Sequence, residues 1–137
     1  MTSGLLLDTC AAIFIVEDQP IRPEARAALY AVGDGGGIFV SPVSGWEIGL
    51  LARRGRMAFA PDAKAWFARL LALRAIHIAP FTHDIAIDCS ALPEPLHADP
   101  ADRFLVATAR SMSVPIMTRD RKLIAYGETG HLQVIAC

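Results

Sequence analysis

Short, wholly apolar runs alternate along this chain with longer segments in which apolar residues recur at helical spacing. Apolar runs of this length between polar residues are typical of strands buried on both faces of a sheet. Five runs are predicted as strands, at residues 5–7, 38–40, 76–78, 115–118 and 132–135. Because helical segments separate the strands, the pattern predicts a three-layer α/β/α domain with a mainly parallel central sheet, formed by residues 1–137 as a single unit.

Helical segments are expected in every interval between these strands. Their predicted positions are 9–16, 23–32, about 43–54, a helix starting at 61–62, 84–92 with Thr82 as its N-cap, a helix starting at 99–100, and a short helical turn at 119–126. In the fourth of these, Ala65, Trp66, Leu70 and Leu73 give an amphipathic face. Trp46 and Trp66 are expected in the core or at an interface.

The segment HADPADRFLVATA at 97–109 combines a helix start with an acidic residue in an unusual position. Asp99 can accept from the first free backbone N–H groups, and Pro100 fits the first turn of a helix. Three apolar residues share the helix face of Asp102, namely Leu105, Val106 and Ala109. A carboxylate at the head of a core-facing stripe needs a donor, a counter-charge, a metal or a wet cleft. The alternative is that Asp102 only closes the helix N-terminus.

Three more acidic residues, Asp8, Glu47 and Asp120, belong to the same predicted edge of the sheet. Asp8 directly follows the first strand, Asp120 lies two residues past the fourth, and Glu47 lies in an apolar stripe of the helix after the second. Sites in open parallel sheets form beyond the carboxyl ends of the strands, so these acids are placed to meet Asp102. Each has an ordinary alternative: a solvated strand end for Asp8, an outward helix position for Glu47, and a turn or cap for Asp120.

Four carboxylates in one place repel one another, and either protonation or a bound cation must relieve that repulsion. Oxygen ligands without His or Cys suit Mg²⁺ or Mn²⁺, which keep several waters and bridge to phosphate. A centre of this kind can activate a water for in-line attack on a phosphodiester and stabilise the leaving oxygen. The four acids therefore predict a metal-dependent hydrolytic site.

Four stretches, in this order, resemble the signatures of the PIN-domain ribonucleases: LLLDT at 5–9, SGWEI at 44–48, DRFLVATA at 102–109 and TRD at 118–120. Their order and the chain length are similar to the VapC-type toxins of bacterial toxin–antitoxin pairs, and the resemblance covers essentially the whole chain. It implies that one or two Mg²⁺ or Mn²⁺ ions are bound by an acidic quartet of Asp8, Glu47, Asp102 and Asp120. Thr118 or Thr9 would help to orient these ligands. Asp99 is assigned to capping, with a ligand role as the alternative.

The resemblance also implies a function and partners. The protein is expected to be an endoribonuclease toxin that leaves a 5′-phosphate and a 3′-hydroxyl, and to be inhibited by a small VapB-type antitoxin that covers apolar surface and blocks the acidic pocket. A homodimer is expected too, and the 53% share of hydrophobic residues fits such covered surfaces. The alternatives are a non-toxin PIN nuclease of RNA processing and a catalytically silent module that captures a basic peptide. A phosphatase with an aspartyl nucleophile is disfavoured, because it requires a second Asp two residues after the first, where this chain has Cys10.

Arginines beside the acidic motifs are candidates for contact with RNA. Arg119 and Arg121 flank Asp120 and are the expected substrate-binding residues, together with Thr118. Arg103 is expected in a structural ion pair. His97 is singled out of four scattered histidines because it directly precedes the acidic motif.

Composition limits the remaining possibilities. The net charge of −1, from 13 basic and 14 acidic side chains, excludes a strongly basic protein that coats DNA without sequence preference. No apolar run reaches membrane-spanning length, and the N-terminal segment lacks the basic region of a signal peptide. The three cysteines show neither zinc-site spacing nor an even count. A cytoplasmic protein with reduced thiols and no membrane contact is expected.

Overall fold

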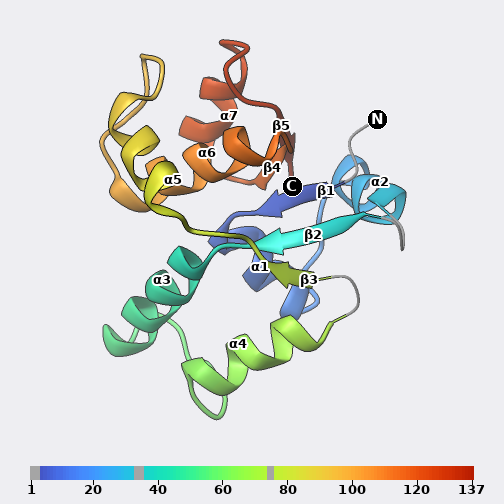
Figure 1. Ribbon diagram of the computed structural model, residues 1–137. Helices are drawn as coiled ribbons and strands as arrows, with labels where there is room; N and C mark the ends of the chain where they lie inside the picture. The colour runs from blue at the N-terminus through green and yellow to red at the C-terminus, as the bar shows by residue number, and fades with distance from the viewer. Residues whose placement is uncertain (1–3, 33–35, 74–75) are drawn as a thin grey trace.

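The computed structural model describes residues 4–32, 36–73 and 76–137, and within them strands and helices alternate (Figure 1). The strands are β1 (Gly4–Leu7), β2 (Gly37–Val40), β3 (Ile76–Ile78), β4 (Ile116–Thr118) and β5 (Val134–Ala136). The helices are α1 (Thr9–Val16), α2 (Pro23–Val32), α3 (Pro42–Arg53), α4 (Ala63–Ala72), α5 (His83–Asp88), α6 (Pro100–Met112) and α7 (Arg121–Gly127), with a 3₁₀ turn, η1 (Cys89–Ala91), after α5. Residues 1–3, part of the segment considered above as a signal peptide, lie outside the described residues.

The described strands form one sheet in the order β3-β2-β1-β4-β5, and each neighbouring pair is parallel. The prediction of an α/β fold with a mainly parallel sheet is thus confirmed, and all five predicted strands are present. From β1 the chain builds outward through β2 to β3, and it then returns to place β4 on the other side of β1. The carboxyl ends of β1 and β4 therefore lie together where the direction of building reverses, which is where open α/β sheets form their sites.

Helices cover both faces of the sheet, and β1 shows why its apolar run is unbroken. Successive strand side chains point to opposite faces. Leu5 and Leu7 pack in the core that includes Trp66 and residues of α1 to α4, whereas Leu6 packs in the core that includes Leu105 and residues of α5 to α7. Figure 1 shows α5, α6 and α7 on one side of the sheet and α1 and α4 on the other. A strand buried on both faces needs apolar residues at every position.

Side-chain caps fix where the helices begin. The hydroxyl of Thr82 accepts from the backbone N–H of Ile85 at 3.2 Å at the start of α5, and Asp99 accepts from the N–H of Ala101 at 3.0 Å at the start of α6. Both caps confirm the sequence predictions. The prediction that Leu73 extends the amphipathic face of α4 was wrong, because the backbone turns to an extended conformation at Leu73 and leaves the side chain 42% exposed.

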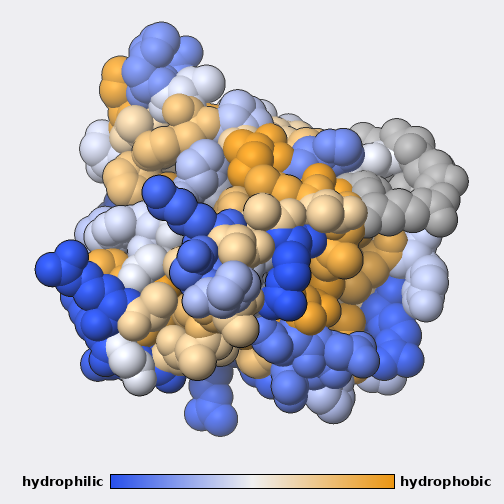
Figure 2. Space-filling model, turned by 90° about the horizontal axis from the view of Figure 1, so that it is seen from below, coloured by the Kyte–Doolittle hydropathy of each residue, from blue (hydrophilic) through white to orange (hydrophobic). Residues whose placement is uncertain are grey.

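The surface keeps several large hydrophobic side chains. Hydrophobic residues gather near the centre and right of the face seen in Figure 2, above hydrophilic residues along its lower edge. Trp66 is buried in the core, whereas Trp46 is 56% exposed. Trp46 lines an apolar cavity of about 340 Å³ together with Pro42, Val43, Phe81 and Phe104. None of the described helices is both long and apolar enough to cross a membrane.

Candidate metal centre

Asp8 stands at the carboxyl end of β1, directly beside the end of β4. Its backbone N–H donates to the carbonyl of Met117 at 3.0 Å, so the two strands hold it at their shared edge. Its carboxylate caps α1 by accepting from the N–H of Ala11 at 2.7 Å, and its other oxygen accepts from the hydroxyl of Thr118. Asp8 is only 4% exposed, and this burial raises its pKa from 3.8 to about 6 despite both hydrogen bonds.

Glu47 reaches the same edge from the helix that follows β2. Ser41 caps α3 by accepting from the N–H of Val43 at 3.0 Å, and Pro42 occupies the first turn. One turn further on, Oε1 of Glu47 accepts a hydrogen bond from the hydroxyl of Thr9, the residue after Asp8. Burial raises the pKa of Glu47, and the hydrogen bond from Thr9 opposes that rise.

Asp102 heads the buried stripe of α6, as its sequence predicts. Leu105, Val106 and Ala109 on its face are all buried. The Asp102 side chain is mostly buried, and its Oδ2 lies 2.7 Å from Nε2 of His97. Burial raises the pKa of Asp102, while the hydrogen bond to His97 acts against it.

Asp120 caps the last helix and is linked to Asp8 through one hydroxyl. Its Oδ1 accepts from the N–H of Lys122 at 2.7 Å and from the N–H of Leu123 at 3.4 Å. The backbone N–H of Asp120 donates to Oγ1 of Thr118 at 3.0 Å, and the same Thr118 hydroxyl donates to Asp8. Thr118 is fully buried, so its one hydroxyl fixes the relative position of two of the four acids.

Neighbouring carboxyl groups raise the pKa values of Asp8, Glu47 and Asp102, although among the described residues only Asp102 of the four belongs to a group of three side chains with ligand atoms within 4.8 Å of one another. The charges of Asp102 and Asp120 add to the effect of burial at Asp8, and the charges of Asp102, Asp99 and Asp8 do the same at Glu47. No Lys or Arg forms an ion pair with the four acids in the described part of the chain. Partly buried acids that no Lys or Arg neutralises fit an oxygen-preferring divalent cation, which would supply positive charge.

The two arginines predicted to contact substrate differ in their surroundings. The guanidinium of Arg119 donates to the carbonyls of Pro20 at 3.1 Å and Cys137 at 3.0 Å, and it lies 3.9 Å from the ring centre of Phe14. These contacts tie the loop after α1 to the last residue of the sheet region. Arg121 is exposed at the first turn of α7.

Arg103 was predicted in an ion pair, and its observed hydrogen-bond partners are backbone carbonyls instead. Its guanidinium donates to the carbonyls of Leu96 at 3.3 Å, His97 at 3.4 Å and Cys89 at 3.3 Å. The carbonyls belong to a segment that turns back over the start of α6. A sequence pattern cannot reveal such a partner, because it depends on how the loop folds.

The family model described as PIN domain matches residues 5–128. The chain belongs to the PIN-domain family. It is also 31% identical over 124 residues to Ribonuclease VapC22 of Mycobacterium tuberculosis (strain ATCC 25618 / H37Rv), an alignment that covers 90% of this chain and 91% of the relative. The resemblance drawn from the four sequence stretches is thus confirmed.

Solved structures share the fold of this PIN domain. A chain of VapBC2 from Rickettsia felis, bound to a DNA fragment from their promoter, aligns with a TM-score of 0.71 at 12% identity, over 97% of this chain and 98% of that one. A chain of a toxin-antitoxin complex from Klebsiella pneumoniae aligns with a TM-score of 0.62 at 24% identity, over 96% and 95%. At these identities the likeness concerns the fold alone.

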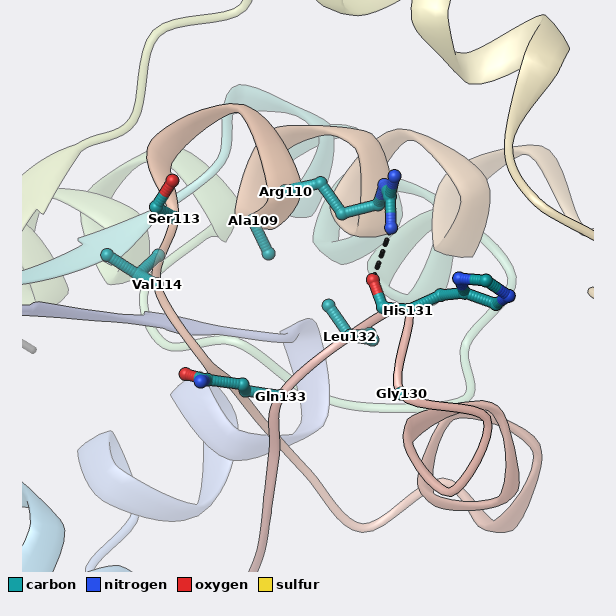
Figure 3. A pocket seen from close by; sticks show the side chains of 8 residues that line it. All are labelled: Ala109, Arg110, Ser113, Val114, Gly130, His131, Leu132 and Gln133. Carbon is teal, nitrogen blue, oxygen red and sulfur yellow. Dashed lines mark hydrogen bonds between the residues drawn. The ribbon is translucent and has the colours of Figure 1, made fainter.

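Two pockets of the PIN domain lie at different distances from the acidic residues. The pocket in Figure 3, of about 310 Å³, lies between the end of α6 and the segment before β5, where Arg110 donates to the carbonyl of His131. Arg110 is two turns along α6 from Asp102, roughly 12 Å, so this pocket lies apart from the metal centre. A cavity of about 540 Å³ has His97 and Lys122 in its wall and lies beside the centre.

Proposed function

We propose that this PIN-domain protein is a metal-dependent endoribonuclease and the toxin of a toxin–antitoxin pair. The observation that carries the proposal is the convergence of Asp8, Glu47, Asp102 and Asp120 beside the ends of β1 and β4, with raised pKa values at the first three and no Lys or Arg paired with them in the described residues. The name of the relative Ribonuclease VapC22 supports the activity. A silent module that captures a basic peptide would use the same four acids, so the cleavage assay below is what separates the two functions.

The four acids would hold one or two Mg²⁺ or Mn²⁺ ions. Carboxylate oxygens are the ligands that both ions prefer, and the ions retain waters with which they bridge to phosphate. When bound, a divalent cation supplies Lewis-acid stabilisation for the charge that develops at the phosphodiester and activates the attacking water. The products would carry a 5′-phosphate and a 3′-hydroxyl.

The protein's own contribution is to hold the acids in place before a cation or RNA arrives. Asp8 is fixed from two sides, by the N–H of Ala11 and by the Thr118 hydroxyl. The hydroxyl of Thr9 holds Glu47. Ligands held by surrounding hydrogen bonds lose little entropy when they bind, and this is how protein scaffolds tune a metal site.

Partners follow from the surface around this centre. The apolar cavity at Trp46 lies next to Glu47 in sequence, and we assign this surface to a small VapB-type antitoxin, in keeping with the toxin–antitoxin complexes among the structural neighbours. Exposed hydrophobic side chains elsewhere leave surface for a homodimer. Arg121 would contact the RNA backbone. Thr118, which is fully buried, would act on the site through the hydrogen bond that its hydroxyl donates to Asp8. We also propose a cytoplasmic location, where an RNA substrate and an antitoxin would both be present.

Cleavage of a labelled, mixed-sequence single-stranded RNA tests the activity. Wild-type protein should cut it in Mg²⁺ or Mn²⁺ and not in a chelator, and Asp8→Asn and Asp102→Asn should each abolish cutting. Asp62→Asn is the matched control, because Asp62 caps α4 through the N–H of Ala65 at 2.8 Å, as Asp8 caps α1, yet is not among the acids that act on Asp8, Glu47 or Asp102. Asp62→Asn should retain activity.

Other outcomes would count against the proposal. Folded wild-type protein that leaves RNA intact in both metals, across a pool that includes structured RNAs, would favour a silent binding module. Cutting that persists in the chelator would contradict metal dependence. The toxin role is tested separately by induced expression in bacteria: growth should stop with wild type, continue with Asp8→Asn, and recover when the neighbouring antitoxin gene is co-expressed.

A further inference from the structure

His97 makes a short hydrogen bond to the acid that heads α6, and the proposed function leaves this imidazole without a role. Nε2 of His97 lies 2.7 Å from Oδ2 of Asp102, and the two side chains are 18% and 15% exposed. The only other His–carboxylate pair in the described residues, His83 with Asp84, is 3.5 Å apart and 88% and 83% exposed. The first pair is therefore sheltered from water, which makes its hydrogen bond stronger than that of a surface pair.

The backbone that carries His97 is hydrogen-bonded to α6, which carries Asp102, and its preceding segment is hydrogen-bonded to α7, which Asp120 caps. Arg103, the neighbour of Asp102 on α6, donates to the carbonyl of His97 and to that of Leu96. On the other side, the hydroxyl of Tyr126 in α7 donates to the carbonyl of Pro93 at 2.8 Å. The segment from Pro93 to His97 is thus pinned between α6 and α7, and the imidazole is held against Asp102 before any cation binds.

A carboxylate only accepts hydrogen bonds, so the imidazole must donate through Nε2–H. We propose that His97 is a positioning residue of the metal centre, which holds Oδ2 of Asp102 so that the other carboxylate oxygen is presented to the cation. This inference rests on the proposed function, because it presumes that Asp102 is a ligand. A partner that orients a ligating carboxylate acts through preorganisation, and loss of such a partner typically weakens metal binding by about 10–100-fold.

A direct ligand role is the competing explanation. Ligand atoms of His97, Asp99 and Asp102 all lie within 4.8 Å of one another, close enough to surround one ion. Two observations favour positioning instead. Nε2 of His97 is already engaged with Asp102, and Oδ1 of Asp99 is engaged with the backbone N–H of Ala101 as the cap of α6.

Mn²⁺ affinity, measured by calorimetry on the full chain, tests the proposal. His97→Ala should weaken Mn²⁺ binding by about 10-fold or more. His97→Gln should recover most of the loss, since its amide N–H can donate from a similar position, and His83→Ala should bind as wild type does. Equal affinity of wild type and His97→Ala would overturn the positioning role, as would a His97→Gln variant no better than His97→Ala.

Two spectroscopic measurements complete the test. In electron spin-echo spectra of bound Mn²⁺, wild-type protein should show no nitrogen coupling from His97; such a coupling would make His97 a ligand and overturn the proposal. In metal-free protein, nuclear magnetic resonance should detect a slowly exchanging Nε2–H of His97 that disappears in Asp102→Ala. Absence of that proton in wild type would refute the hydrogen bond. If wild type binds no Mn²⁺, the proposed function fails, while the metal-free spectrum still decides the contact between His97 and Asp102.

Discussion

Replacing Asp8 with asparagine should stabilise the metal-free protein at neutral pH, although it removes a residue central to the proposed activity. Asp8 is buried, and its pKa is raised to about 6 first by burial and then by the charges of Asp102 and Asp120. Ionisation therefore destabilises the folded state. Asparagine keeps the acceptor for the N–H of Ala11 that caps α1 and carries no charge.

The magnitude follows from the change in pKa on folding. A tenfold change in proton affinity corresponds to about 1.4 kcal/mol, so a rise from 3.8 to about 6 corresponds to about 3 kcal/mol. Asp8 binds its proton more tightly in the folded protein than in the unfolded chain. Protonation of Asp8 therefore stabilises the folded protein at low pH, and this stabilisation is lost as pH rises from about 4 through 6. The advantage of Asp8→Asn should be under about 1 kcal/mol at pH 4 and about 3 kcal/mol above pH 7.

Urea unfolding in a chelator, at intervals from pH 4 to pH 8, measures this difference. In Asp8→Asn, rearranged hydrogen bonds at Thr118 change the free energy of unfolding by an amount that does not depend on pH. The test is therefore how the difference between Asp8→Asn and wild type changes with pH. Asp62→Asn, which makes the same substitution at an exposed helix cap, is the control. A difference between Asp8→Asn and wild type that stays constant from pH 4 to pH 8 would refute the assignment of a raised pKa to Asp8.

Three further predictions concern the metal, the hydroxyl link and the arginines. In calorimetry, Mn²⁺ should raise the Tm of wild type more at pH 7.5 than at pH 5, because protonated carboxyl groups bind the ion poorly. An equal rise at both pH values would indicate that Mn²⁺ binds at another site. Thr118→Val should destabilise the protein by about 1–3 kcal/mol in urea, and more at pH 8 than at pH 5, because ionised Asp8 loses its buried donor. Arg119→Ala should lower the urea midpoint of unfolding, because Arg119 binds two backbone carbonyls. Arg121→Ala should instead lower RNA affinity in a filter-binding assay. The reverse pattern would show that Arg119 contacts the substrate.

The fold was largely predictable because its signals are local. The run of leucines at 5–7 has no polar position, and only a strand covered on both faces accepts this. Thr82 and Asp99 marked helix starts through chemistry that acts within three residues. Leu73 was misplaced because the end of α4 depends on the turn into β3, which hydrophobic spacing does not encode.

The candidate site was predictable mainly from the rule that sites in open parallel sheets form beyond the carboxyl ends of the strands. That rule placed Asp8, Glu47 and Asp120 at one edge from their positions after strands, and helix periodicity placed Asp102 on a buried face. The contacts that hold the acids join residues far apart in sequence, as Thr118 joins Asp8. His97 lies five residues before Asp102 and outside its helix, so no periodic pattern pairs them.

The most direct test of the central claim is to locate Mn²⁺ by its anomalous scattering in crystals of the protein soaked with the ion. Our account predicts a peak enclosed by carboxylate oxygens of Asp8, Glu47, Asp102 and Asp120, absent from crystals of Asp102→Asn or strongly reduced in them. Mn²⁺ bound elsewhere on the protein, with this edge of the sheet empty at saturating concentration, would contradict the account.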